Sequence, residues 1–133
     1  MKSKLPWLFA GAGILALALV VFQPWRRVAA AHPEPRPGVT AERVLPPAMI
    51  ENTPGALEAY EAARRVPQVL DGLYCHCNCS KFEGHRSLLT CFESNHGARC
   101  DICMGEAMLA QKLAAEGNSL QQIRSAIDAQ FGS

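Results

Sequence analysis

The sequence predicts an all-α protein. We expect a small, irregular helical domain around a cysteine and histidine site, behind an N-terminal transmembrane helix and a proline-rich linker. Three observations lead to this prediction. Apolar residues in the second half recur at helical spacing and rarely alternate as they would in strands. All but one of the nine prolines precede residue 55, and all six cysteines lie between residues 75 and 103.

Residues 1–27 are predicted to be a membrane anchor or a signal segment. Residues 5–22 carry no charge, and Lys2 and Lys4 precede them. An uncharged run of this length is just long enough to cross a bilayer. We expect an uncleaved, single-pass helix in the inner (cytoplasmic) membrane, with the cysteine-rich domain on the periplasmic, extracytoplasmic side. Cleavage after Ala31, the last of three consecutive alanines, is the alternative.

Residues 28–52 are predicted to form a proline-rich linker. Large apolar side chains are few there, so burial cannot offset the entropy lost on ordering the chain. The segment contains Pro33, Pro35, Pro37, Pro46 and Pro47. This composition favours an extended, semi-rigid tether that holds the helical domain off the membrane. A ligand for a proline-recognising module is the alternative.

The helical domain is predicted to occupy residues 53–133. A threonine followed by a proline opens its first helix, over residues 53–66, as an N-cap and a first helical residue. Pro67 then starts a short turn of helix that ends at Gly72. Residues 75–79 are too few and too polar for a regular element.

More helices are expected after the first cysteines. A short helix is predicted over residues 84–92, and a longer one over residues 98–116 that ends where Gly117 takes a left-handed conformation. Ser119 and Gln122 have the spacing of a capping box and open the last helix. The apolar face of that helix consists of Leu120, Ile123, Ile127 and Phe131.

The cysteines and two histidines are the candidate metal ligands. They are Cys75, Cys77, Cys79, His85, Cys91, His96, Cys100 and Cys103. Thiolates and imidazoles together suit a thiophilic ion. Cys100 and Cys103 stand three residues apart at the predicted start of a helix, where the helix dipole favours thiolates and both sulfurs can reach one ion.

The C-x-C-x-C run at residues 75–79 is the rarer motif. Residues two apart in an extended chain point the same way, with Cα atoms about 6.6 Å apart. The run therefore suits a clip that shares its thiolates among more than one ion, and it suits disulfides between its neighbours poorly. His85 and Cys91 can join the same site only if the short helix between them packs endwise on it.

Met104 and Met108 follow Cys100 at four-residue steps along the predicted long helix. A thioether beside a thiolate site would favour copper(I). Two core methionines that fill gaps between helices are the alternative interpretation.

The order of these motifs resembles a bacterial family. The matching residues are Tyr74-Cys75-His76-Cys77-Asn78-Cys79, Gly84-His85, Cys91-Phe92, His96-Gly97 and Cys100-x-x-Cys103. The run is similar to the P-C-Y-C-G-C motif after which the family is named, over residues 60 to 131. Tyr74, His76 and Asn78 replace its proline, tyrosine and glycine. The family is exported, usually membrane-tethered and described as of unknown function. The resemblance therefore implies one site of eight ligands, without His76, and does not name the ion.

These features predict a metal-binding module outside the cytoplasm rather than an enzyme. Copper(I) is the first candidate ion and zinc the second, for sequestration, delivery or sensing, with a metal-donor or metal-acceptor protein as partner. Two alternatives stay open. Three disulfides could staple an exported interaction domain, or Cys100 and Cys103 could serve a thiol–disulfide oxidoreductase. Nucleic acid is not an expected partner, because beyond the basic flanks of the apolar run 9 basic residues face 12 acidic ones.

Overall fold

All regular structure in residues 30–132, the part of the chain that the computed structural model describes, is helical. This confirms the all-α prediction for that part, which contains no strand. The predicted membrane segment, residues 1–27, lies outside the described residues. Among residues 30–132, no helix has the length and apolar character needed to cross a membrane.

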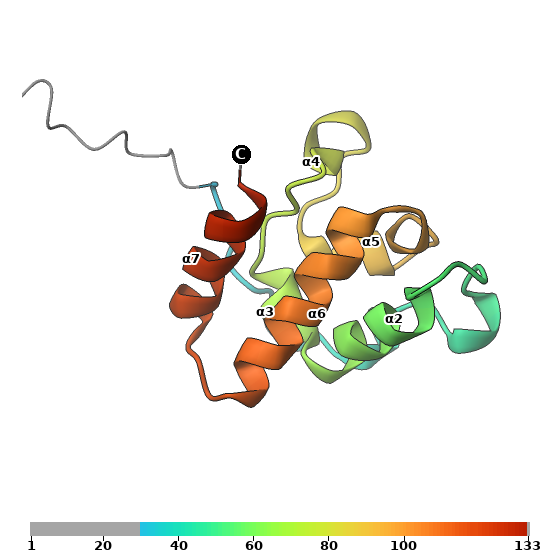
Figure 1. Ribbon diagram of the computed structural model, residues 1–133, viewed down its shortest axis with the longest axis horizontal. Helices are drawn as coiled ribbons and strands as arrows, with labels where there is room; N and C mark the ends of the chain where they lie inside the picture. Colours follow the sequence, from blue (N-terminus) through green and yellow to red (C-terminus); the bar gives the residue numbers. More distant parts are fainter. Residues whose placement is uncertain (1–29, 133) are drawn as a thin grey trace, which may run out of the picture.

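Helix α6 (Asp101–Ala115) lies in the middle of the molecule, between α2 (Ala56–Arg65) and α7 (Leu120–Phe131) (Figure 1). Small side chains on the facing surfaces of α2 and α6 let the two helices pack closely. Those that are fully buried are Ala59, Ala63, Ala107 and Ala110. Ile123 and Ile127 pack from α7 into the same core, and burying each such side chain contributes about 2 kcal/mol.

Tyr60 on α2 fixes the loop that precedes α6. Its ring meets Phe92 edge to face, with ring centroids 4.9 Å apart. Its hydroxyl donates to the carbonyl of Ser94 at 2.5 Å and accepts from the backbone N–H of Ala98 at 3.1 Å. Because both ends of this fully buried side chain are held, the backbone on either side of His96 has a defined position.

The first helix begins later than the sequence predicts. Thr53 does not cap α2, because its hydroxyl donates to the carbonyl of Ala98 at 2.6 Å. The chain turns at Gly55, whose φ of 79° is in the left-handed region, and α2 starts at the next residue. The expected restart at Pro67 is confirmed: α3 spans Pro67–Asp71 and is followed by Gly72.

The short helix predicted over residues 84–92 is only half as long. Helix α5 spans Leu88–Phe92, because Gly84 has a φ of 69° and Ser87 is extended at −149°. One turn of helix that the sequence did not predict, α4 (Cys79–Phe82), stands at one end of the molecule (Figure 1). The residues between α4 and α5 are therefore irregular, which frees His85 from helical geometry.

The long helix is divided at its start. A 3₁₀ helix, η3 (Gly97–Arg99), precedes it, and Cys100 is extended, with φ −134° and ψ 107°. Cys100 is thus the N-cap residue of α6 rather than a member of one continuous helix. At the other end the prediction is confirmed, because α6 stops before Gly117, whose φ is 84°.

Helix α7 agrees closely with the sequence-based prediction. The hydroxyl of Ser119 accepts from the backbone N–H of Gln122 at 3.3 Å. The Gln122 side chain accepts in return from the backbone N–H of Ser119 at 2.8 Å, which completes the capping box. Ile123 and Ile127 are buried, and Leu120 and Phe131 pack against the core at the margin.

Residues 30–52 run along the helical domain and contact it throughout. They contain two 3₁₀ helices, η1 (Ala41–Arg43) and η2 (Pro47–Met49), and bury Val39 and Val44 in the core. The expectation of an extended tether rested on the prolines and on the scarcity of large apolar side chains, but burial of Val39 and Val44 is enough to pack the segment against the core. The division of the chain at residues 28 and 53 stays a prediction.

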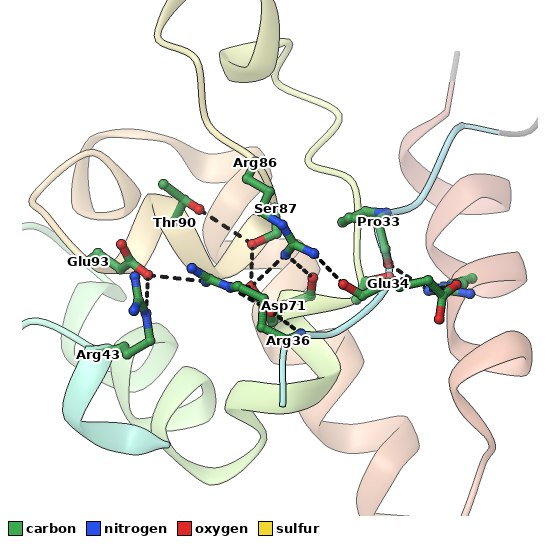
Figure 2. A network of polar contacts seen from close by, with 11 residues as sticks. Pro33, Glu34, Arg36, Arg43, Asp71, Arg86, Ser87, Thr90 and Glu93 are labelled. Carbon is green, nitrogen blue, oxygen red and sulfur yellow. Dashed lines mark hydrogen bonds and ion pairs between the residues drawn. The ribbon is translucent and has the colours of Figure 1, made fainter. Parts of the chain in front are cut away.

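One polar network of this segment centres on Asp71 at the end of α3, which Arg36 contacts (Figure 2). Its fully buried carboxylate pairs with Arg36 at 2.7 Å and with Arg86 at 3.0 Å. The Ser87 hydroxyl donates to it at 3.0 Å. Asp71 therefore ties the N-terminal segment to α3 and to the start of α5, the two elements that border the cysteine-rich loops.

Candidate metal centre

The structure brings all eight predicted ligands into one cluster. Neighbouring ligand atoms fall into four overlapping groups, and within each group all atoms lie within 4.8 Å of one another. The groups are Cys77, His96, Cys100 and Cys103; Cys79, His85, Cys91 and His96; Cys75, Cys77 and Cys79; and Cys75, Cys91 and Cys103. We call these eight residues the ligand cluster. The loop before α4 and the start of α4 supply it, together with the loop before α5, α5 itself, the turn at His96 and the start of α6.

The C-x-C-x-C run is curled rather than extended. Asn78 has a φ of 62°, in the left-handed region, and it reverses the chain directly before α4. Asparagine tolerates this conformation better than most residues do. The sulfurs of Cys75 and Cys77 lie 3.4 Å apart, and the reversal at Asn78 brings Cys79 within 4.8 Å of both.

The sulfurs of Cys75, Cys77 and Cys103 lie close together in the ligand cluster. The contact of Cys75 with Cys103 joins the C-x-C-x-C run to α6. The Cys75 Sγ lies 3.4 Å from Sγ of Cys103, which α6 presents from its first turn. The Cys103 sulfur also lies 3.6 Å from Sγ of Cys77, and the three form a triangle. Two sulfurs on one tetrahedral ion, each at about 2.3 Å from it, lie about 3.8 Å apart. The triangle is thus close to the spacing that a shared ion needs.

His85 and Cys91 meet, because α5 begins only at Leu88 and leaves His85 in a loop. The His85 Nδ1 lies 3.3 Å from the Cys91 sulfur. The same sulfur lies 3.4 Å from that of Cys79. The two residues therefore meet without the endwise-packed helix that the sequence-based prediction required, because His85 lies in the loop before α5.

The two histidines share a carboxylate that sequence reasoning missed. Glu83 lies 2.9 Å from Nδ1 of His96 and 3.5 Å from Nε2 of His85. The opposite nitrogens face sulfurs: His96 Nε2 lies 3.7 Å from Cys77, and His85 Nδ1 faces Cys91. A carboxylate behind a metal-binding imidazole fixes its orientation and tautomer. Glu83 occupies that position for both rings.

All six cysteines are free thiols. The shortest sulfur–sulfur separations within the ligand cluster are 3.4 Å, whereas a disulfide bond is about 2.05 Å long. Among the described residues, therefore, no pair stands at the bonding distance that a disulfide-stapled domain requires.

The buried thiols resist ionisation when no cation is near. Hydrogen bonding to Cys103 and burial raise the pKa of Cys75. Contact with Cys103 lowers the pKa of Cys91, but contact with Cys75 and burial outweigh this and raise it. The pKa of Cys103 is likewise raised, because Cys91 and burial outweigh the lowering effect of Cys75. A bound cation would replace these protons, so binding would release them.

His76 points away from the ligand cluster, in agreement with its exclusion from the predicted ligands. Its Nδ1 lies 2.5 Å from Oε1 of Glu106, which also accepts from the His76 backbone N–H at 3.0 Å. Its Nε2 lies 3.1 Å from Asp128 on α7, and His32 contacts the same carboxylate oxygen at 3.1 Å.

Glu106 is fully buried and was not found from the sequence. Burial raises its pKa, although the Cys75 thiol and His76 lower it. The sequence does contain a signal for Glu106: it is a charged residue one helical turn after Cys103, on the same buried face of α6 as Cys103 and Ala107. A polar residue on such a face indicates a buried partner, which here is the backbone and ring of His76.

The two methionines of α6 differ in their surroundings. Met104 is part of the hydrophobic core, with 9% of its surface exposed. Met108 is 46% exposed and borders a shallow depression between α2 and α6, next to Glu58 and Arg65. The core interpretation therefore fits Met104.

The family model for the "protein of unknown function with PCYCGC motif" matches residues 38–133. The chain belongs to this family. The match begins in the N-terminal segment that contacts the helical domain, and it spans the whole ligand cluster of this PCYCGC-motif protein. No curated protein and no solved structure matches the chain. The family gives no activity, so the function has to be argued from the ligand cluster itself.

Proposed function

We propose that this PCYCGC-motif protein binds a thiophilic metal ion through the ligand cluster, for sequestration, delivery or sensing. The observation that carries the proposal is the mutual approach of six thiols and two imidazoles, whose ligand atoms lie within 4.8 Å of one another in each of four overlapping groups. Unrelated buried cysteines have no reason to converge in this way. Cations of the soft class need this donor set.

The surroundings of the sulfurs support a bound cation. Cys75, Cys79, Cys91 and Cys103 are each at most 3% exposed. Burial favours the neutral thiol, as the raised pKa values of Cys75, Cys91 and Cys103 indicate, but a metal cation beside them reverses that preference, because a coordinating thiol is deprotonated outright. The site therefore suits a cation and would hold anionic thiolates poorly without one.

Copper(I) is the ion that we put first and zinc second. Within the ligand cluster, sulfur donors outnumber imidazole donors six to two, and no carboxylate belongs to any of the four groups. Soft thiolates select copper(I) as well as zinc. Zinc stays a candidate because sets of three cysteines and one histidine are common tetrahedral zinc sites.

We further propose the cellular setting. Residues 1–27 would anchor the chain in the inner membrane by a single pass, with the ligand cluster on the periplasmic side. A metal-donor or metal-acceptor protein would then be the partner. Labelling of the cysteines in intact cells with a membrane-impermeant thiol reagent, after a chelator has removed the ion that would protect them, tests this orientation. Labelling only after the membrane is permeabilised would contradict it.

The test of metal binding uses the full-length chain, purified in mild detergent without oxygen. Loaded with copper(I) or with zinc and then dialysed, it should retain metal by elemental analysis and protect its six thiols from alkylation. A chelator selective for the ion should expose them again. The double variant Cys75→Ser/Cys103→Ser should retain less metal. The control is Met108→Leu, which removes a soft sulfur that is exposed and lies outside the ligand cluster, and it should leave the metal content unchanged.

Two results would overturn the proposal. The first is a chain that retains neither ion while all of its thiols alkylate freely. The second is a chain with no titratable thiol under denaturing conditions, which would favour the disulfide-stapled alternative. Trapping of a mixed disulfide by Cys103→Ser would favour the oxidoreductase alternative instead.

A further inference from the structure

We infer that the ligand cluster holds two ions in two positions of equal donor set and unequal access, an inner ion that is retained and an outer ion that is exchanged. This inference rests on the proposed function and deepens it. The outer position consists of Cys77, Cys100, Cys103 and His96. The inner position consists of Cys75, Cys79, Cys91 and His85.

Coordination number makes one ion insufficient. Thiophilic ions such as zinc take four protein ligands in a closed site, and the ligand cluster offers eight. The two four-membered groups of neighbouring ligand atoms have only His96 in common. Assigning His96 therefore decides how the eight ligands divide.

His96 belongs to the outer position. Its Nε2 faces Cys77 at 3.7 Å, while its Nδ1 faces Glu83 at 2.9 Å. One imidazole nitrogen binds one ion, and here the second nitrogen has a carboxylate partner. Cys75 then takes the vacant place in the inner position, because its sulfur lies within 4.8 Å of those of both Cys79 and Cys91. Each position thus obtains three thiolates and one imidazole.

The two positions touch at Cys75. Its sulfur lies 3.4 Å from the sulfurs of Cys77 and of Cys103, both of which belong to the outer position. These separations are no longer than those inside each position, such as 3.4 Å between Cys79 and Cys91. Cys75 is therefore placed to bridge the two ions.

Access differs sharply between the positions. The inner cysteines are nearly inaccessible, with Cys91 completely buried and Cys75 and Cys79 each 3% exposed. In the outer position, Cys77 and Cys100 are partly exposed. An incoming ligand can therefore reach the outer ion while the inner ion stays covered.

The exchange step involves no redox change. The thiolate of a partner protein bonds to the outer ion, and the bond from that ion to Cys100 breaks. The Cys100 sulfur takes up the proton that the partner thiol loses on binding, so charge and protons balance. The partner is accordingly a metal carrier with an exposed thiol.

The test uses the full-length chain in detergent with cadmium-113 ions alone as a spectroscopic probe. Two resonances from ions with several sulfur ligands are expected. Cys100→Ser should abolish one of them and keep the inner one, and serine suits this N-cap position. His85→Asn should abolish the other. Cys77→Ser replaces Cys100→Ser if that variant loses its helical circular dichroism.

Release kinetics test the unequal access. With excess dithiol chelator, cadmium should leave the unmodified chain in two phases that differ at least tenfold in rate, and Cys100→Ser should lack the fast phase. A single resonance, one release phase, or loss of both resonances in each variant would overturn the inference. If the chain binds no cadmium, copper(I) or zinc, the proposed function itself fails, and that outcome is distinct.

Discussion

Replacement of Asp71 by asparagine should destabilise the domain without changing the shape of the buried side chain. The carboxylate is fully buried and pairs with Arg36 and Arg86, and Ser87 donates to it (Figure 2). Asparagine keeps the volume but loses the charge that both arginines face. The residues next affected are those between α3 and α5, which include Cys75, Cys79 and His85 of the inner position.

The magnitude follows from the pKa of Asp71. Burial alone would raise it, but the hydrogen bonds from Arg36 and Ser87 lower it from 3.8 to about 2. At about 1.4 kcal/mol per pKa unit, this corresponds to roughly 2.5 kcal/mol of stability at neutral pH. Because Arg36 is 34% exposed and Arg86 38%, solvent screens the ion pairs. We therefore expect a loss of about 2 kcal/mol, or roughly 10 °C in melting temperature.

Urea unfolding followed by circular dichroism, with reductant and chelator present, measures this loss as a function of pH. The folded pKa of Asp71 lies below the unfolded value of 3.8. Its contribution is therefore complete above about pH 5 and disappears as the pH falls toward about 2. The two stability curves should converge at acid pH.

The control, Glu116→Gln, changes an exposed carboxylate and should shift stability by less than about 0.5 kcal/mol. A constant gap between the unmodified chain and Asp71→Asn down to pH 2 would refute the electrostatic argument.

Three further outcomes are expected. Glu83→Gln should weaken metal affinity about tenfold in chelator competition. This is the low end of the effect expected for a carboxylate that orients a metal-binding histidine, because Glu83 is 51% exposed. An unchanged affinity would contradict its orienting role. Gly97→Ala should cost about 1–3 kcal/mol in urea unfolding, because the added carbon would lie 3.1 Å from the Cys91 carbonyl oxygen and from the Phe92 ring. Ser119→Ala should cost about 1 kcal/mol and leave the metal content unchanged, since it removes only a helix cap; a change in metal content would show coupling between α7 and the ligand cluster.

The elements that the sequence predicted well are those governed by local signals. The capping box at Ser119 and the left-handed Gly117 depend on residues close together in the sequence. The C-terminal end of α6 and the start of α7 could therefore be predicted. The start of α5 was not, because Gly84 permits but does not require a left-handed turn. Thr53 was misread for a related reason: its hydroxyl has a partner 45 residues away, at Ala98.

The gathering of the eight candidate ligands could be predicted from residue chemistry, whereas the contacts among them could not. Cysteine and histidine are informative wherever they concentrate, and the structure brings together all eight ligands that were named. Which sulfur approaches which depends on the left-handed Asn78 and on the packing of α6, and neither can be read from spacing. Glu83 escaped notice because exposed glutamates are common, and only the geometry relates it to both imidazoles.

Two buried carboxylates help to position residues 75–79, the cysteine clip, and this bears on the proposed release of an ion. Asp71 fixes the chain before the clip through Arg36 and Arg86, and Glu106 fixes the middle of the clip through the backbone and ring of His76. Neither carboxylate belongs to the four ligand groups.

The hydrophobic core includes large side chains that are not candidate ligands, among them Tyr60, Phe92 and Ile127. In zinc fingers the metal supplies the folding energy, so losing the ion unfolds the domain. Here Asp71 and Glu106 position the clip through contacts between protein groups alone, which do not require an ion. Release of the outer ion would then leave a folded acceptor ready to bind again, which suits delivery better than permanent structural binding.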